Sequence, residues 1–179
     1  MRNKKLVELC IISMIAAIYA ALTLALAPLS FGEIQIRISE ALTLLPILFP
    51  SAIWGVTLGC FIANLVGVLY GLNGIGIIDI FFGTAATLLA AMSTYQLRNI
   101  RIKNIPFLSA LMPVLFNAVI IGLELAWLLF PDTLISGWLL MGAQVGIGEF
   151  AACFILGIPL TIHLEHSATF NKLIEYIKK

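Results

Sequence analysis

Four acidic side chains lie in or beside strongly apolar segments, and they are the residues of this chain best suited to chemistry. They are Glu40, Asp79, Glu124 and Glu149. An uncompensated charge in apolar surroundings is costly, so each acid is expected to face a bundle interior and to pair, bind something or become neutral. Arg37 is the one basic residue near them, and one arginine cannot satisfy four acids. The excess of acids predicts a polar, net acidic pocket for a solute with several hydrogen-bond donors.

Three amide side chains share the depth of these acids in the apolar segments. They are Asn64, Asn117 and Gln144. A structural network, in which Arg37 pairs with one acid and the amides join helices, is the alternative for any single residue. The inner half of the apolar segments is almost without polar groups, which argues against a continuous aqueous channel.

The elements that position these residues are membrane spans. The chain has 179 residues, of which 61% are hydrophobic and 11% charged, and its mean hydropathy is +1.10. A soluble domain carries about 25% charged residues. A span needs about 20 apolar residues, so the spans take up most of the chain and leave no room for a soluble catalytic domain. The sequence therefore predicts a single integral-membrane domain over residues 1–179.

The basic residues predict the topology. Nine of the ten lie in three clusters, Arg2 to Lys5, Arg98 to Lys103 and Lys172 to Lys179. Cytoplasmic loops retain positive charge, so all three clusters are expected on the cytoplasmic side. Each stretch between them must then cross the bilayer an even number of times. We therefore predict an all-α bundle of six transmembrane helices with both termini cytoplasmic. The clusters flank spans and do not indicate nucleic-acid binding.

Apolar runs and prolines place the six predicted segments. The second is short, because Pro46 weakens it and Pro50-Ser51 ends it. The loop 31–39 alternates apolar and polar residues in a strand-like way, and the tail 164–179 is amphipathic, as expected for a cytoplasmic helix at the membrane interface. The predicted segments are about Leu6 to Ala27, Ser39 to Phe49, Ser51 to Tyr70, Ile78 to Leu97, Pro106 to Phe130 and Gly137 to His163.

Small residues form a stripe along the first predicted span. Ala17, Ala21 and Ala25 recur every four residues, and Ala16 and Ala20 lie beside them. Small residues at this spacing permit close helix approach. The stripe either packs within this chain or docks on a partner membrane protein.

Other kinds of site find little support in the sequence. The three cysteines are odd in number and lie in apolar surroundings, so neither a disulfide framework nor a metal site is expected. The glycine-rich stretch Gly71 to Gly76 lacks the following Gly-Lys-Ser/Thr of a phosphate-binding loop, and no G-x-S-x-G or H-E-x-x-H motif occurs. We expect no enzyme, no metal and no cofactor in this chain.

Several motifs together resemble those of the QueT family. The first is Ile36-Arg-Ile-Ser-Glu-Ala-Leu-Thr-Leu-Leu-Pro46. The later ones are Gly59-Cys-x-x-Ala-Asn64, Ile78-Asp-Ile-x-Phe-Gly-Thr84 with Ala86-Thr87, Asn117-Ala-x-Ile-x-Gly-x-Glu-Leu125 and Gly146-x-Gly-Glu149. The resemblance runs from the first span to the sixth.

The resemblance implies a substrate-binding S component of an energy-coupling-factor (ECF) transporter in a bacterial cytoplasmic membrane. It implies a queuosine-related 7-deazaguanine as substrate, whether queuosine, queuine or a biosynthetic precursor. It also implies a scaffold membrane protein and two ATPases as partners, so that ATP is used by the partners, and it assigns docking on the scaffold to the alanine stripe. Tyr70, Trp127 and Trp138 are the candidate aromatic faces for the planar ring.

Two other functions stay open on the sequence. A self-sufficient proton-coupled carrier would use Glu124 or Glu149, although no internal repeat of the kind found in many carriers is visible. An S component for a different vitamin-like substrate would share the fold and the partners. A small intramembrane enzyme is disfavoured by the missing catalytic motifs.

Overall fold

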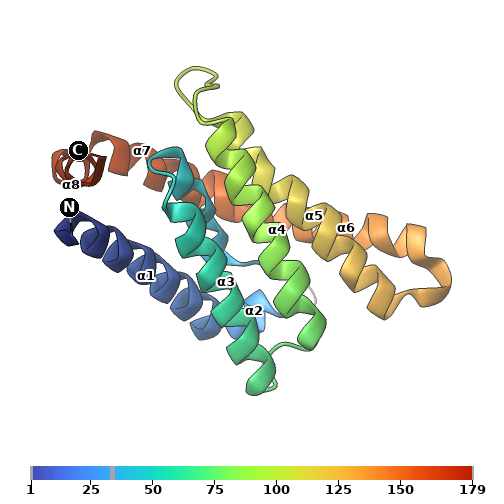
Figure 1. Ribbon diagram of the computed structural model, residues 1–179. Helices are drawn as coiled ribbons and strands as arrows, with labels where there is room; N and C mark the ends of the chain where they lie inside the picture. Colours follow the sequence, from blue (N-terminus) through green and yellow to red (C-terminus); the bar gives the residue numbers. More distant parts are fainter. Residues whose placement is uncertain (1, 33–34, 179) are drawn as a thin grey trace.

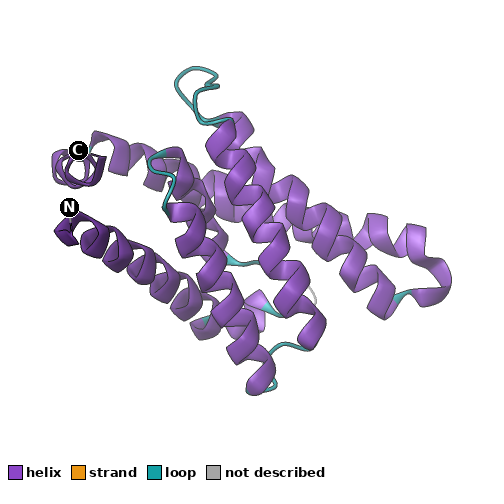
Figure 2. Cartoon of the chain, in the orientation of Figure 1, coloured by secondary structure: helices purple, strands orange, loops and turns teal. Residues whose placement is uncertain are grey.

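The computed structural model describes residues 2–32 and 35–178, and every regular element in this part of the chain is helical (Figure 2). The elements in chain order are α1 (Arg2–Ala25), α2 (Ala27–Ser30), η1 (Ile38–Ile47), α3 (Ala52–Leu69), α4 (Ile77–Gln96), α5 (Phe107–Leu129), η2 (Pro131–Thr133), α6 (Leu134–Phe150), η3 (Ala151–Gly157), α7 (Ile158–His166) and α8 (Ala168–Lys178). The predicted all-α fold is confirmed.

Five of these helical runs are long and apolar enough to cross a membrane, namely α1, α3, α4, α5 and the continuous run from Pro131 to His166. The helix η1 is apolar but shorter. Figure 1 places the start of α1, the loop between α4 and α5, and α8 toward one end of the bundle, and the turns after α3 and α5 toward the other. The count of six crossings and the cytoplasmic position of the termini stay predictions.

The short second segment was correctly predicted to end before Ser51, but its conformation was not predicted. Residues 38–47 form a 3₁₀-helix that contains Pro46, and α3 begins at Ala52. Runs of 3₁₀-helix longer than three or four residues are uncommon. Tertiary packing must therefore hold η1, and it contacts α1, α3, α4, α5, α7 and η3.

Close approach at glycines joins the long helices. A Cβ atom at Gly59 would lie 2.7 Å from Tyr19 Cβ and 2.9 Å from the Ala16 carbonyl oxygen, so α1 and α3 almost touch there. A Cβ atom at Gly122 would lie 2.6 Å from Gly142 Cα, which brings α5 equally close to α6. Small residues at such contacts allow backbones to approach within a membrane.

Two local predictions need correction. The strand-like loop contains no strand in residues 31–32 and 35–39, because Ile38 and Ser39 already begin η1; residues 33–34 lie outside the described part. The first span ends at Ala25, and Ala27, its predicted end, already begins the one-turn helix α2. The apolar stripe of the tail (Phe170, Leu173, Ile174 and Ile177) packs on an apolar cluster formed largely by α1, α3 and Phe49. Its position at the membrane interface stays a prediction.

Candidate functional site

The segment between α2 and η1 carries the first site residues and lies directly on α6. A Cβ atom at Gly148 would come within 2.2 Å of the Gln35 carbonyl oxygen. Glycine at this position therefore lets the extended backbone around Arg37 rest on α6. This contact brings Arg37 and the start of η1 within electrostatic reach of Glu149, the next residue of α6.

Arg37 forms an ion pair with Asp79, as expected if Arg37 belongs to a structural network and pairs with one of the acids. Its Nη2 lies 2.9 Å from Asp79 Oδ2, and both side chains are buried. Its Nε donates to the Ser30 carbonyl oxygen at 3.3 Å, and its guanidinium lies 5.4 Å from the Phe31 ring centroid. Asn73 donates from Nδ2 to the same Asp79 oxygen at 2.7 Å. The pair thus ties the segment before η1 to the start of α4.

Asn64 belongs to the same network. Its Nδ2 donates to the Asp79 backbone carbonyl at 2.9 Å. Gly83 leaves room for this contact, because a Cβ atom there would lie 2.6 Å from both Asn64 Nδ2 and Asp79 Oδ1. Arg37, Asp79 and Asn64 are therefore brought together, and they hold α3, α4 and the segment before η1 in one arrangement.

Glu40 is held by one carboxylate oxygen only. The hydroxyl of Tyr19 donates to Glu40 Oε1, and Thr87 Oγ1 lies 3.4 Å from the same oxygen. The neighbouring residues Thr23 and Ser39 share a 2.7 Å hydrogen bond. Oε2 of Glu40 is buried and has no hydrogen-bond partner among the described residues. One face of α1 thus positions Glu40 and leaves its second oxygen available.

Glu149 and Asn117 form a second group with open hydrogen-bonding capacity. Glu149 is 3% exposed and lies beside Asn117, within electrostatic reach of Glu40. Glu149 Oε2 and Asn117 Nδ2 are buried, and neither finds a partner in the part of the chain that the structure describes. The helix changes to π-helix two residues later, at Ala151. A π-helical stretch inside a longer helix is rare and is often found at functional sites.

Glu124 lies on α5, within electrostatic reach of Asp79 and Arg37. Its carboxylate is buried, and neither oxygen has a hydrogen-bond partner among the residues described. It borders a cleft of about 230 Å³ lined otherwise by apolar side chains, Ile78, Phe82, Leu123, Trp127 and Leu134. Glu124 is the one acid of the four with both oxygens free.

A larger pocket opens at the end of the bundle that holds the turns after α3 and α5. It has a volume of about 410 Å³ and lies between the α2–η1 segment, the α3–α4 loop, α5 and α6. Gln35 and Gln144 line it, and their Nε2 and Oε1 atoms respectively are buried without a partner within the described ranges. Its remaining lining is largely apolar and includes Phe31, Leu125, Phe130 and Met141.

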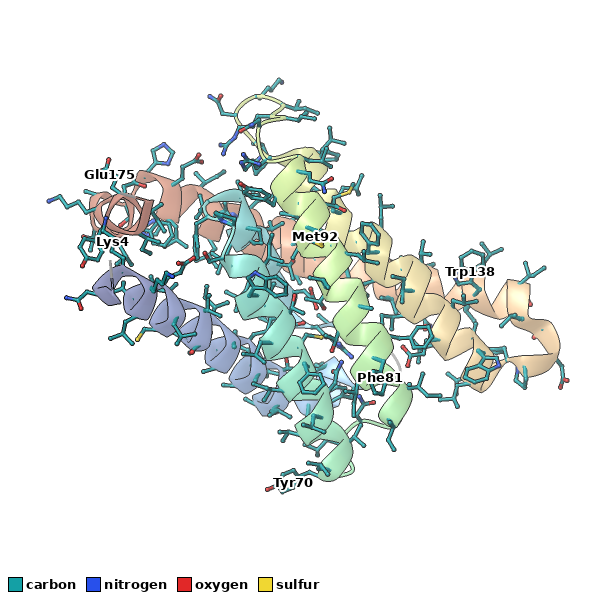
Figure 3. The ribbon with its side chains drawn as sticks, viewed as in Figure 1. Lys4, Tyr70, Phe81, Met92, Trp138 and Glu175 are labelled. Carbon is teal, nitrogen blue, oxygen red and sulfur yellow. The ribbon has the colours of Figure 1, made fainter. Side chains whose placement is uncertain are left out.

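Of the three aromatic residues singled out from the sequence, only Trp127 lies beside a site residue, in the cleft that Glu124 borders. Tyr70, a predicted substrate-binding residue, lies beyond the last residue of α3 and is 77% exposed, pointing away from the bundle in Figure 3. Trp138 is half-buried and donates from Nε1 to the Val119 carbonyl oxygen, on the outside of the α5–α6 pair in Figure 3. Trp127 is 60% exposed. Phe31 and Phe130 instead offer aromatic faces at the larger pocket.

Sequence reasoning did not assign roles to Tyr19, Asn73, Thr87 and Gln35. Tyr19 and Thr23 are one turn apart on the face of α1 away from the alanine stripe, a spacing visible in the sequence. Nothing in the sequence points to Asn73, because its hydrogen bond to Asp79 depends on how the α3–α4 loop folds back. Within residues 2–32 and 35–178 no three His, Cys, Asp or Glu side chains gather as metal ligands, and the absence of a metal stays a prediction.

The fold and the buried polar site define a multi-pass helical membrane protein. The family model described as "QueT transporter" matches residues 9–166, so the chain belongs to the QueT transporter family. It is also 31% identical over 90 residues to the "Queuosine precursor transporter QueT" of Lactococcus lactis subsp. cremoris (strain MG1363). That match covers 49% of this chain and 49% of the relative, so the chain aligns with about half of the relative's length. No solved structure matches the chain.

Proposed function

We propose that the chain is the substrate-capture subunit of an ECF-type importer and that it binds a queuosine-related 7-deazaguanine. Membership of a transporter family and the printed name of the Lactococcus relative support the substrate class. Capture takes place in the interior between η1, α4, α5 and α6, reached through the pocket that Gln35 and Gln144 line. The energy for import comes from ATPases outside this chain.

The observation that carries the proposal is the surplus of buried, unpartnered hydrogen-bond acceptors. Glu40, Glu124 and Glu149 together hold four such carboxylate oxygens. A deazaguanine presents a ring N–H and an exocyclic amine side by side, and a carboxylate with two free oxygens accepts both at once. Glu124 meets that requirement, and Glu40 or Glu149 suits the ammonium of an aminomethyl-bearing precursor.

Hydrogen-bond donors and an apolar face in the site also match the deazaguanine ring. The ring carbonyl of a deazaguanine needs a donor, and the unpartnered amide nitrogens of Asn117 and Gln35 supply one. Phe31 and Phe130 line the larger pocket, where an aromatic ring can cover a planar ligand. Arg37, Asp79 and Asn64 act in this proposal as the frame that positions η1.

The exposed part of the alanine stripe is the proposed docking face for the scaffold protein. Ala17, Ala21 and Ala25 are exposed, whereas Ala16 and Ala20 are buried. Packing within the chain therefore uses one edge of the stripe and leaves the other open. A partner helix can approach closely where only methyl groups project.

A titration of the purified chain without ATP tests capture directly. We expect binding of queuine or an aminomethyl-7-deazaguanine, and no comparable binding of riboflavin as a vitamin-like control. Riboflavin binding in place of the deazaguanine would assign the S component to a different substrate. Uptake into liposomes by the chain alone, driven by a proton gradient, would establish the proton-coupled carrier instead.

Substitution of the alanine stripe separates docking from capture. Ala21→Trp should leave substrate affinity of the isolated chain nearly unchanged, because the proposed binding residues lie on other helices. The same change should abolish uptake in cells and co-purification with the scaffold protein. A loss of affinity as large as that of Glu124→Gln would show that this face packs within the chain.

A further inference from the structure

The loop between α4 and α5 carries three cations and is tied to α7 by one of them. Arg101 forms two parallel hydrogen bonds to Glu165, Nη1 to Oε2 at 2.8 Å and Nη2 to Oε1 at 2.7 Å. The loop tip is a two-residue turn, in which Ile102 and Ile105 exchange backbone hydrogen bonds and Lys103 and Asn104 have positive φ. This geometry is that of a tight hairpin turn, so the loop has a defined shape.

Two cavities flank the Arg101–Glu165 ion pair. One, of about 520 Å³, lies between the end of η1 and the end of α4, and the other, of about 420 Å³, lies between the hairpin and α7. Both are bordered by Arg101 and Glu165. The larger is lined in addition by Ile47, Leu48, Pro50, Tyr95, Arg98 and Asn99. The smaller is lined in addition by Lys103, Asn104, Ile105, Ile162 and His166.

The charges of these cavities are not balanced by protein groups. Arg98 and Lys103 have no acidic partner within 4.0 Å in the described part of the chain, and Glu165 forms its ion pair with Arg101. The Arg98 guanidinium lies 3.9 Å from the Tyr95 ring centroid and donates from Nη1 to the Tyr95 carbonyl oxygen. Its planar fork is thus held in place at the larger cavity. Such a fork matches the oxygens of a phosphate group.

Exposed apolar side chains make this cationic loop suited to the edge of the bilayer. Ile100, Ile102 and Ile105 are 47%, 56% and 39% exposed, and they alternate with the basic residues. Phe107, at the start of α5, is also exposed. Isoleucines that project beside cations suit the boundary where acyl chains meet phosphates, and the loop projects at one end of the bundle in Figure 1.

We propose that each of these two cavities binds the phosphate group of one anionic membrane lipid of the phosphatidylglycerol kind. Arg98 contacts the phosphate in the larger cavity and Lys103 the phosphate in the smaller one. The Arg101–Glu165 pair separates the two cavities, and the acyl chains lie along the exposed isoleucines. In the predicted topology this loop is cytoplasmic; basic pockets at the cytoplasmic ends of spans commonly take such headgroups, and that leaflet is anionic. The site lies near the end of the bundle opposite the turns after α3 and α5, so it is separate from substrate capture.

A lipid titration of the purified full chain in neutral detergent, read by native mass spectrometry, tests the site. Phosphatidylglycerol should bind about tenfold more tightly than phosphatidylcholine with the same acyl chains, and Arg98→Gln should reduce the affinity about fivefold. Glu165→Gln removes the one acid and should increase it about fivefold. Lys172→Gln is the matched control, because Lys172 is exposed on α8 and lines neither cavity.

Each contrary result would overturn the proposal. Equal binding of the two lipids would show that charge plays no part. A loss for Lys172→Gln as large as for Arg98→Gln would reduce the effect to general surface charge. A lower lipid affinity in Glu165→Gln would show that the Arg101–Glu165 ion pair has a purely structural role. Displacement of the lipid by equimolar inorganic phosphate or glycerol phosphate would assign the cavities to a soluble ligand.

Discussion

The contact between Gly148 and the segment before η1 provides the sharpest test of the site geometry. Gly148→Ala adds one methyl group whose carbon would lie 2.2 Å from the Gln35 carbonyl oxygen. The obstructing atom belongs to backbone, and the Arg37–Asp79 pair ties the same segment to α4. The segment therefore cannot turn aside as a flexible side chain would, and η1 must shift with it.

The expected size follows from two opposing effects. Overpacking of a tight contact costs about 1–3 kcal/mol. Replacement of a glycine within a helix by alanine returns about 0.5–1 kcal/mol. The two effects leave a net loss of up to about 2.5 kcal/mol in the free energy of unfolding, with a central value of about 1.3 kcal/mol. Displacement of Arg37 and Glu40 relative to Glu149 should in addition weaken substrate binding about tenfold, because site groups must hold their geometry closely.

Gly146→Ala, on the same helix, is the matched control. A Cβ atom at Gly146 would meet only Ala118 Cβ, at 3.5 Å, which is an ordinary contact. This variant should match or exceed the parent in stability and bind substrate normally. Thermal unfolding in detergent at one scan rate and a calorimetric titration of the ligand measure both properties. Equal behaviour of the two variants would refute the close contact between the segment and α6.

Three more predictions concern the acids, their support and the topology. Glu124→Gln and Glu149→Gln should each weaken ligand binding about tenfold or more in a calorimetric titration while the protein still folds, because a buried charged hydrogen bond to ligand is lost; unchanged affinity in both would remove them from the site. Tyr19→Phe should lower the free energy of unfolding by about 1.5–3 kcal/mol, because Glu40 loses a charged hydrogen bond; no change in chemical denaturation would contradict that role. Single cysteines at positions 3, 74, 102 and 175, with Cys10 replaced, should react with an impermeant thiol reagent from outside only at position 74; any other pattern contradicts six crossings.

Much of the fold follows from local sequence. Runs of apolar residues mark the long helices, and Pro50 marks the end of the short second segment, because proline is disfavoured in the interior of an α-helix. The burial of Glu40, Asp79, Glu124 and Glu149 follows from the cost of exposing charge to lipid. These inferences need only composition, spacing and the bilayer as solvent.

The remaining features depend on contacts between distant segments. Asp79 and Glu149 are both acids in similar surroundings, yet Asp79 forms an ion pair with Arg37, whereas Glu149 forms none among the described residues. Only the path of η1 across the bundle decides between them. Tyr70 was predicted as an aromatic face for a planar ligand, but α3 ends one residue before it and its side chain is 77% exposed.

The 3₁₀ conformation of η1 means that a mismatch between the length of this segment and the thickness of the bilayer has little effect on it. Ten residues at about 2.0 Å each extend roughly 20 Å, against about 15 Å as α-helix, and the hydrocarbon core is about 30 Å thick. The three-residue repeat sorts the side chains into three rows. The first row, with Leu42 and Leu45, packs on the apolar cluster formed largely by α1, α3 and Phe49. The second row, with Leu44, contacts α7 and η3. The third row carries Glu40 and Thr43. With protein on every side, η1 has no row left for lipid, so its length is set by its neighbours.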